Sequence, residues 1–133
     1  MEARLESYRP QMLSVLRILF GLLYLCHGLP KVFNYPVAGP PNFQILSLLG
    51  AAAVIEIVGS TLLTVGLFTR LAAFVMSGEM AVAYWFVTRR PTVSFIPIVN
   101  KGELEVIFCF VFLYFVFAGA GPWSLDALLR KKA

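Results

Sequence analysis

The stretch that decides the fold runs from Ile45 to Val87 and reads ILSLLGAAAVIEIVGSTLLTVGLFTRLAAFVMSGEMAVAYWFV. It contains two apolar runs, Ile45 to Phe68 and Leu71 to Val87, separated only by Thr69 and Arg70. Each run is about long enough to cross the hydrocarbon core of a bilayer as a helix, which takes roughly 20 residues. Because a lone segment in hydrocarbon satisfies its backbone only as a helix, the stretch predicts two antiparallel membrane helices joined by a tight turn.

Two more apolar segments, Gln11 to Leu29 and Glu103 to Ala118, flank this hairpin. The chain has 133 residues, of which 59% are hydrophobic and 14% charged, and its mean hydropathy is +0.82. Such values are typical of a membrane-embedded chain. We therefore expect an all-α, polytopic four-helix bundle that forms a single domain over residues 1–133, with spans at about 11–29, 45–68, 71–87 and 103–118.

Two longer connections, Pro30 to Gln44 and Thr88 to Gly102, fall on one face of the predicted bundle, which we take as the outer face. Because proline lacks an N–H and clashes inside a helix, we expect the segment from Pro30 to Pro36 to be a loop. The sequence Pro122 to Asp126 favours a helix start. Leucines followed by basic residues then predict a short amphipathic C-terminal helix on anionic lipid.

The basic residues gather near the ends of the apolar segments, as membrane anchors do, and a nucleic-acid partner is not expected from this distribution. The face with the termini carries Arg4, Arg9, Arg70, Arg130, Lys131 and Lys132, and the other face carries Lys31, Arg89, Arg90 and Lys101. Six against four predicts that both termini are cytoplasmic, because cytoplasmic loops of membrane proteins are richer in Lys and Arg.

Glu56 and Glu79 lie near the middle of adjoining predicted helices and at similar depth. A carboxylate at that depth is costly, so each must face protein or water, pair with a partner or stay protonated. Antiparallel neighbours can turn both groups into one cavity, where two close carboxylates would share a proton. Either the pair marks a proton or ligand site, or it forms interhelical hydrogen bonds that only fix packing.

Further titratable residues lie toward the two faces. Arg17, near the cytoplasmic face, could extend outward or turn in toward a carboxylate. Near the outer face, His27 and Lys31 end the first helix, while Glu103 and Glu105 begin the fourth. These four residues predict a titratable vestibule under the two long loops, unless the acids only favour a helix N-terminus and Lys31 only anchors at the headgroups.

The sequence offers little for metals or redox cofactors. Cys26 and Cys109 lack a Cys-x-x-Cys spacing, so no metal site is expected and both are interpreted as small buried hydrophobes. A lone histidine, His27, cannot supply both axial ligands of a bis-His haem within one chain, which disfavours haem. No phosphate-binding loop or dinucleotide fingerprint occurs either, so redox chemistry would come from a partner.

Several short motifs follow one another along nearly the whole chain. They are Arg17-x3-Gly21, His27-Gly28-x2-Lys31, Glu56-x2-Gly59, Leu63-x2-Gly66-Leu67-Phe68-Thr69-Arg70, Asn100-x-Gly102-Glu103 and Gly119-Ala120-Gly121-Pro122-Trp123-Ser124-Leu125-Asp126. In this order they resemble the DoxX family of small four-helix membrane proteins. The family pattern carries over to Gly28, Lys31, Glu56, Gly59, Gly66, Arg70, Glu103, Gly121, Ser124 and Asp126. Many members have a histidine after the third helix, where this chain has Thr88-Arg89-Arg90, so no role for that imidazole is expected here.

The resemblance implies a polytopic protein of the prokaryotic inner membrane, in a family named for a subunit of an archaeal quinone-linked oxidase and of a related thiosulfate:quinone oxidoreductase. It implies an accessory or quinone-binding subunit of such a system, with membrane lipid and other respiratory subunits as partners. A small-solute or proton-coupled transporter and a purely structural assembly subunit are the alternatives. Whether the chain forms a homo-oligomer and whether it acts as an enzyme stay open at this point.

Overall fold

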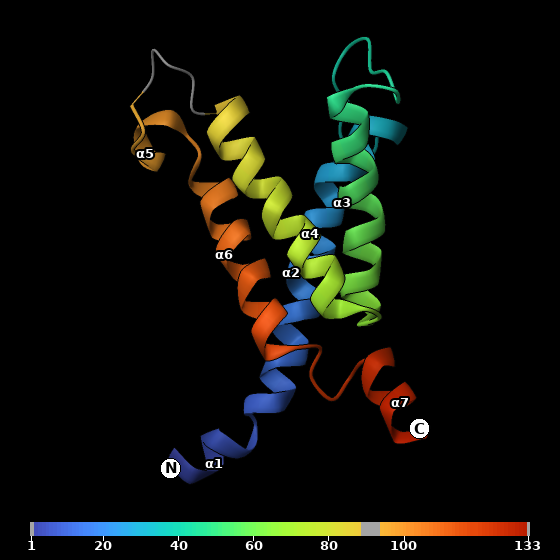
Figure 1. Ribbon diagram of the computed structural model, residues 1–133, viewed down its shortest axis with the longest axis vertical. Helices are drawn as coiled ribbons and strands as arrows, with labels where there is room; N and C mark the ends of the chain where they lie inside the picture. Colours follow the sequence, from blue (N-terminus) through green and yellow to red (C-terminus); the bar gives the residue numbers. More distant parts are fainter. Residues whose placement is uncertain (1, 89–93, 133) are drawn as a thin grey trace.

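The computed structural model describes residues 2–88 and 94–132, and in these ranges it contains helices and no strand (Figure 1). The all-α prediction is therefore confirmed for the described residues. In chain order the elements are α1 (Glu2–Ser7), α2 (Arg9–Phe33), α3 (Leu48–Val65), α4 (Thr69–Val82), the π-helix η1 (Ala83–Thr88), α5 (Pro97–Asn100), α6 (Glu103–Ala118) and α7 (Leu125–Lys132).

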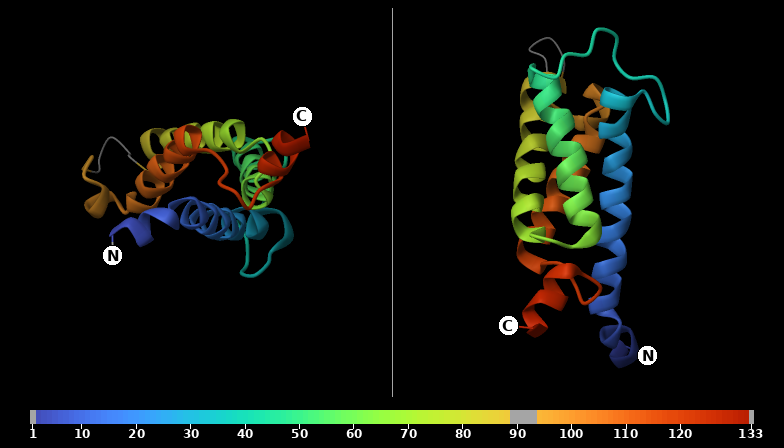
Figure 2. Two further views of the ribbon diagram at one scale, coloured as in Figure 1. Left: turned by 90° about the horizontal axis from the view of Figure 1, so that it is seen from below. Right: turned by 90° about the vertical axis from the view of Figure 1, so that its right-hand side faces the viewer.

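Within the described residues, three helices are long and apolar enough to cross a membrane: Arg9–Phe33, Leu48–Val65 and Thr69–Thr88. They pack as α2 on α3 and α3 on α4, and the 16-residue α6 lies alongside α4 (Figure 2). Both termini lie at one end of the molecule with α1, α7 and the turn between α3 and α4 (Figure 1). We call this the terminal end, and we call the opposite end, with residues 34–47 and α5, the loop end.

Glycines bring the backbones of α2 and α3 into close contact. A Cβ built on Gly21 would lie 2.3 Å from Oγ1 of Thr64, and one on Gly28 would lie 2.8 Å from Cγ1 of Ile57. Small residues at such spacing are typical of tightly packed membrane helices. The approach at Gly28 also positions the neighbouring residue of α3, Glu56, whose Cβ would lie 3.0 Å from the added atom.

The prediction of a loop from Pro30 was wrong for its first four residues, because α2 continues to Phe33 with Pro30 inside it. A proline in a helix removes one N–H bond and bends the chain, but in the last turn few later bonds depend on it. The helix ends at Asn34, which adopts a left-handed conformation and donates its N–H to the Pro30 carbonyl at 3.1 Å. Lys31 therefore belongs to a helix face and not to a flexible loop.

At the terminal end, α7 is joined to the turn between α3 and α4. The backbone N–H groups of Phe68 and Thr69 donate to the two carboxylate oxygens of Asp126 at 2.9 and 3.0 Å. The Asp126 N–H donates in return to the carbonyl of Gly66 at 2.8 Å. Partial burial raises the pKa of Asp126, but the hydrogen bonds from Thr69 and Phe68 outweigh it, so the net pKa lies below its ordinary value. The predicted C-terminal helix is seen as α7, which begins at Leu125.

Candidate functional site

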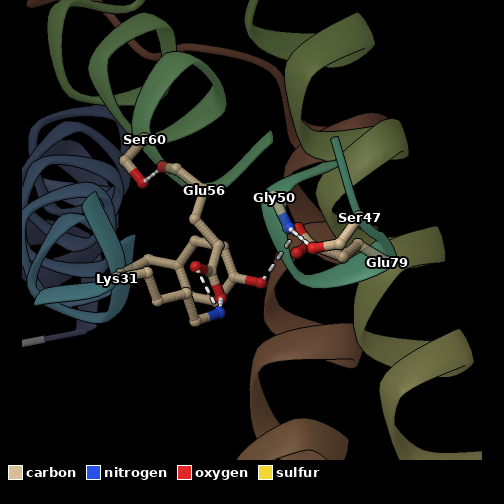
Figure 3. Close-up of polar contacts among 7 residues, drawn as sticks. Lys31, Ser47, Gly50, Glu56, Ser60 and Glu79 are labelled. Atoms are coloured by element: carbon tan, nitrogen blue, oxygen red, sulfur yellow. Dashed lines mark hydrogen bonds and ion pairs between the residues drawn. The ribbon is translucent and has the colours of Figure 1, made fainter. Parts of the chain in front are cut away.

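The carboxylate of Glu56 is paired with the ammonium group of Lys31. The Lys31 Nζ donates to both Glu56 oxygens at 2.6 Å, and the two side chains are only 21% and 5% exposed (Figure 3). Ser60 lies one turn after Glu56 in α3, and its hydroxyl donates to the Glu56 backbone carbonyl. The Glu56 carboxylate is thus held from α2 by Lys31, and the Ser60 hydroxyl adds a bond to the backbone of α3. The sequence placed Lys31 in a vestibule and Glu56 at the midplane, whereas the structure joins them.

Glu79 reaches the same region from α4 and is bonded on one side only. Its Oε2 accepts a hydrogen bond from the Tyr24 hydroxyl at 3.2 Å, and Tyr24 itself is 1% exposed. Its Oε1 is buried and has no partner among the described residues. A buried carboxylate oxygen without a hydrogen-bond donor is energetically costly. This oxygen is therefore the strongest indication in the region that a ligand or a proton binds here.

A largely apolar cavity of about 370 Å³ lies between α3 and α4, and both glutamates line it together with Lys31. The two acids therefore reach one cavity, but they do not hold each other, since Glu56 binds Lys31 and Glu79 binds Tyr24. The other lining residues are apolar: Leu48, Leu49, Ala51, Ala52, Ile55, Val75, Met80, Val82, Ala83 and Val87. This composition suits a hydrophobic molecule with a small polar head.

A second, more polar cavity of about 200 Å³ lies toward the loop end and shares Lys31, Glu56, Met80 and Ala83 with the first. His27 and Glu105 line it. Glu105 Oε1 accepts a hydrogen bond from Thr88 at 2.8 Å, while its Oε2 is buried without a partner among the described residues. Glu103 is exposed in the first turn of α6 and does not line the cavity. Three of the four predicted vestibule residues thus come together.

Arg17 lies apart from the two glutamates, at the terminal end. It is fully buried and turned inward, but its partners are backbone carbonyls and not a carboxylate. Its Nη1 donates to Leu63 and Thr64 of α3, its Nε to Ala120 at 2.8 Å and its Nη2 to Trp123. Arg17 thus caps the C-terminal carbonyls of α3 and binds the α6–α7 connection.

Comparison with known proteins places this arrangement in a family. The family model described as DoxX matches residues 12–89, which run from α2 through η1. The chain belongs to the DoxX family. It is 45% identical over 131 residues to an uncharacterized protein of Haemophilus influenzae, covering 96% of this chain and 98% of that protein. It is 28% identical over 144 residues to an uncharacterized membrane protein of Mycobacterium tuberculosis, covering 97% and 88%. No solved structure matches the chain.

Two side chains of this DoxX protein contact the candidate acids but were not predicted as site residues. Tyr24 shares a helix face with Arg17 and Gly21 at helical spacing, which was the available signal. Thr88 reaches Glu105 from the end of the π-helix η1, and no sequence pattern predicts that local change of pitch. Arg89 and Arg90, counted above among the basic residues of the outer face, lie outside the described residues. No group of three or more His, Cys, Asp or Glu suited to a metal occurs in the described ranges.

Proposed function

We propose that this DoxX protein binds the head of a quinone-class lipid between α3 and α4, as an accessory subunit of a membrane oxidoreductase. The observation that carries the proposal is the unpaired Oε1 of Glu79 in an apolar cavity that Lys31 also lines. A quinone offers a carbonyl oxygen to a donor and, when reduced, a hydroxyl to an acceptor. The two side chains supply both kinds of partner.

Lys31 and Glu79 would each bind a different oxygen of the quinone head. An ammonium group has three N–H donors, and Lys31 uses two of them on Glu56, so one remains for a carbonyl oxygen. Glu79 would accept from a hydroxyl through Oε1 while Tyr24 holds its other oxygen. The bound quinone would supply the two-electron chemistry, and the partner subunit the electrons.

The seam between α3 and α4 also suits a long apolar tail. A further cavity of about 290 Å³ on the same two helices shares Ile55 and Val75 with the first and continues toward Phe68 and Leu71. None of the residues that line it has a polar side chain. An isoprenoid chain laid along this seam would bury its surface without displacing a polar contact.

The same proposal includes the setting of the site. We infer that α6 is the fourth span of a four-helix bundle and that the described helices form one domain in a prokaryotic inner membrane. The terminal end would face the cytoplasm, in line with its larger number of basic residues. The exposed face of α6, with Phe110, Tyr114 and Phe117, offers contact to lipid, to a respiratory subunit or to a second copy of the chain.

The test is quinone binding by the protein purified in lipid nanodiscs, measured by equilibrium titration and by extraction of bound quinone. Glu79→Gln should weaken binding about tenfold, because a hydrogen bond to a charged group contributes roughly 1.5–3 kcal/mol. Glu103→Gln is the matched control, since this exposed carboxylate lies off both cavities. A wild-type protein that binds no quinone, or an intact respiratory chain in a deletion strain, would contradict the proposal.

A proton-coupled conduit is the second candidate, favoured by the position of Lys31 and Glu56 between the polar cavity and the apolar one. Ionisable groups at depth are typical of proton pathways. Proteoliposome flux that is unchanged in Glu56→Gln and Glu79→Gln would eliminate this candidate. A purely structural subunit would instead lose detergent stability in Glu56→Gln while an associated oxidoreductase activity stays intact.

A further inference from the structure

The terminal end contains a polar cavity that the proposed quinone site does not use. It has a volume of about 340 Å³ and lies between the first turn of α4, the α6–α7 connection and α7. Its lining residues are Arg70, Ala118, Gly119, Ala120, Gly121, Pro122, Ser124, Asp126, Ala127 and Arg130. Two arginines from different helices therefore meet one pocket beside a glycine-containing loop.

The guanidinium group of Arg70 has N–H donors that the protein does not use in the described ranges. Its Nη1 donates to the carbonyls of Val116 and Phe117 at 2.6 and 3.0 Å, which caps the end of α6. Its Nε and Nη2 have no acceptor among the described residues, although a guanidinium carries five N–H donors. Arg130, on α7, is exposed and donates to no protein acceptor in the described ranges. Both guanidinium groups are thus available to a ligand that brings several oxygens.

The one carboxylate in the lining, among the described residues, is that of Asp126, whose charge interacts with Arg130 and offsets only one of the two guanidinium charges. Both oxygens of Asp126 are occupied by the N–H groups of Phe68 and Thr69. The pocket therefore keeps one net positive charge, from two guanidinium groups and one carboxylate. Its net charge favours an anion, and paired arginines bind phosphate oxygens through two-pronged hydrogen bonds.

The α6–α7 connection adds backbone donors to the lining. Gly119 and Gly121 adopt positive φ angles of 82° and 75°, which fold the chain sharply around Ala120. The N–H groups of Ala120 and Gly121 have no protein acceptor in the described part of the chain. Unused backbone N–H groups next to arginines are a common feature of phosphate sites.

The surroundings of the pocket place it at the edge of the apolar surface. Leu71, Phe117 and Trp123 adjoin lining residues in sequence and are 65%, 74% and 57% exposed. Exposed tryptophan and basic residues at the same end of a membrane protein are typical of the headgroup level of a bilayer. We propose that this pocket binds a phosphate group between Arg70 and Arg130, with an anionic phospholipid headgroup and a soluble phosphate as its two sources.

The test measures the thermal stability of the full chain in nanodiscs of phosphatidylcholine, with and without phosphatidylglycerol, and in detergent with inorganic phosphate. Arg130→Gln should lower the apparent affinity for phosphatidylglycerol, taken from the rise in melting temperature with its content, by about tenfold, because it removes charge-assisted hydrogen bonds to the phosphate oxygens. Lys131→Gln is the matched control, because this exposed neighbour on α7 loses the same charge but does not line the pocket.

The outcomes separate the two sources and the alternative of general attraction. Stabilisation by phosphatidylglycerol that is lost in Arg130→Gln and kept in Lys131→Gln supports a lipid headgroup site. Stabilisation by inorganic phosphate with the same dependence on Arg130 supports a soluble phosphate. Equal losses in the two variants would overturn the site in favour of nonspecific surface charge, and so would the absence of stabilisation by either anion. None of these readouts involves quinone binding.

Discussion

The terminal end of this DoxX protein differs from the half with the loop end and the two cavities of the candidate site, which we call the loop half. The difference lies in how the buried charged groups are hydrogen-bonded. At the terminal end, Arg17 gives four hydrogen bonds to backbone carbonyls of α3 and the α6–α7 connection. In the loop half, Glu79 and Glu105 each keep a buried oxygen without a partner among the described residues. A satisfied polar network rigidifies a fold, whereas an incomplete one carries a cost that a fold alone does not explain.

This difference separates the scaffold from the candidate site. Arg17 was a candidate site residue alongside Glu56 and Glu79, but of these three only the acids line the two cavities. Burial alone therefore does not indicate function. Buried side-chain atoms without a partner occur in both halves of the described structure, since Oγ1 of Thr64 and Oγ1 of Thr69 also lack one, but among the ionisable groups only Glu79 and Glu105 have such an atom.

The largest expected loss of stability comes from a substitution at the terminal end. Arg17→Leu would leave the carbonyls of α3 and of the α6–α7 connection without donors, and we expect a loss of roughly 3–5 kcal/mol in unfolding free energy. Unfolding in mixed detergent micelles measures this. Arg9→Leu is the matched control because Arg9 is exposed on the same helix. Equal losses in the two variants would show that the carbonyl cap contributes little.

The second effect tests the ion pair between Lys31 and Glu56 in the loop half. Lys31→Met or Glu56→Leu alone leaves one charge nearly buried and should cost roughly 1.5–3 kcal/mol. The double variant removes both charges, so we expect it to recover most of that loss, as buried ion pairs often do when both members become apolar. The same unfolding measurement on all four proteins gives the coupling energy. Additive losses would mean that Lys31 and Glu56 do not stabilise each other.

Much of the fold could be predicted, because long apolar runs dictate membrane helices wherever they occur. The observed α6, Glu103–Ala118, coincides with the predicted segment. The other ends differ by a few residues, since caps set them: Ser47 accepts the Gly50 N–H at the start of α3, and Gly66 ends it with a φ of +72°. Pro30 was misjudged because a proline in a last turn costs too little to stop a helix.

The candidate site could be predicted only in its residue types. Ionisable residues in apolar runs are conspicuous, so Glu56, Glu79 and Arg17 were predicted as buried candidates, whereas Lys31 was predicted to lie in the outer vestibule. The pairing of Lys31 with Glu56 could not be predicted, because it depends on α2 continuing past Pro30 and on the close contact at Gly28. The partners of Arg17 are backbone carbonyls, which every residue has, so no sequence pattern distinguishes them.

The third effect sharpens the contrast inside the loop half. Glu79→Gln keeps an oxygen for the Tyr24 hydroxyl and removes the buried charge, so we expect unfolding free energy to change by less than about 1 kcal/mol. Glu56→Gln should lower the unfolding free energy more, because it also leaves the ammonium group of Lys31 without an opposite charge. Unfolding curves of the two variants in one detergent decide the order. If Glu79→Gln is the more damaging change, Glu79 serves the scaffold and the unpaired oxygen is no mark of a site.

The smallest expected effect is a pH dependence of thermal stability that comes from Asp126 at the terminal end. Because the pKa of Asp126 is lower in the folded protein than its ordinary value of about 3.9, the ionised carboxylate stabilises the fold. That contribution is complete above the ordinary pKa and is lost as the pH falls through it toward the folded value. The melting temperature of the wild type should therefore drop below about pH 4.5 more steeply than that of Asp126→Asn, which cannot ionise. Glu103→Gln, which alters an exposed carboxylate far from the turn, should keep the slope of the wild type. If Asp126→Asn keeps it as well, the two hydrogen bonds from Phe68 and Thr69 do not favour the charged form of Asp126.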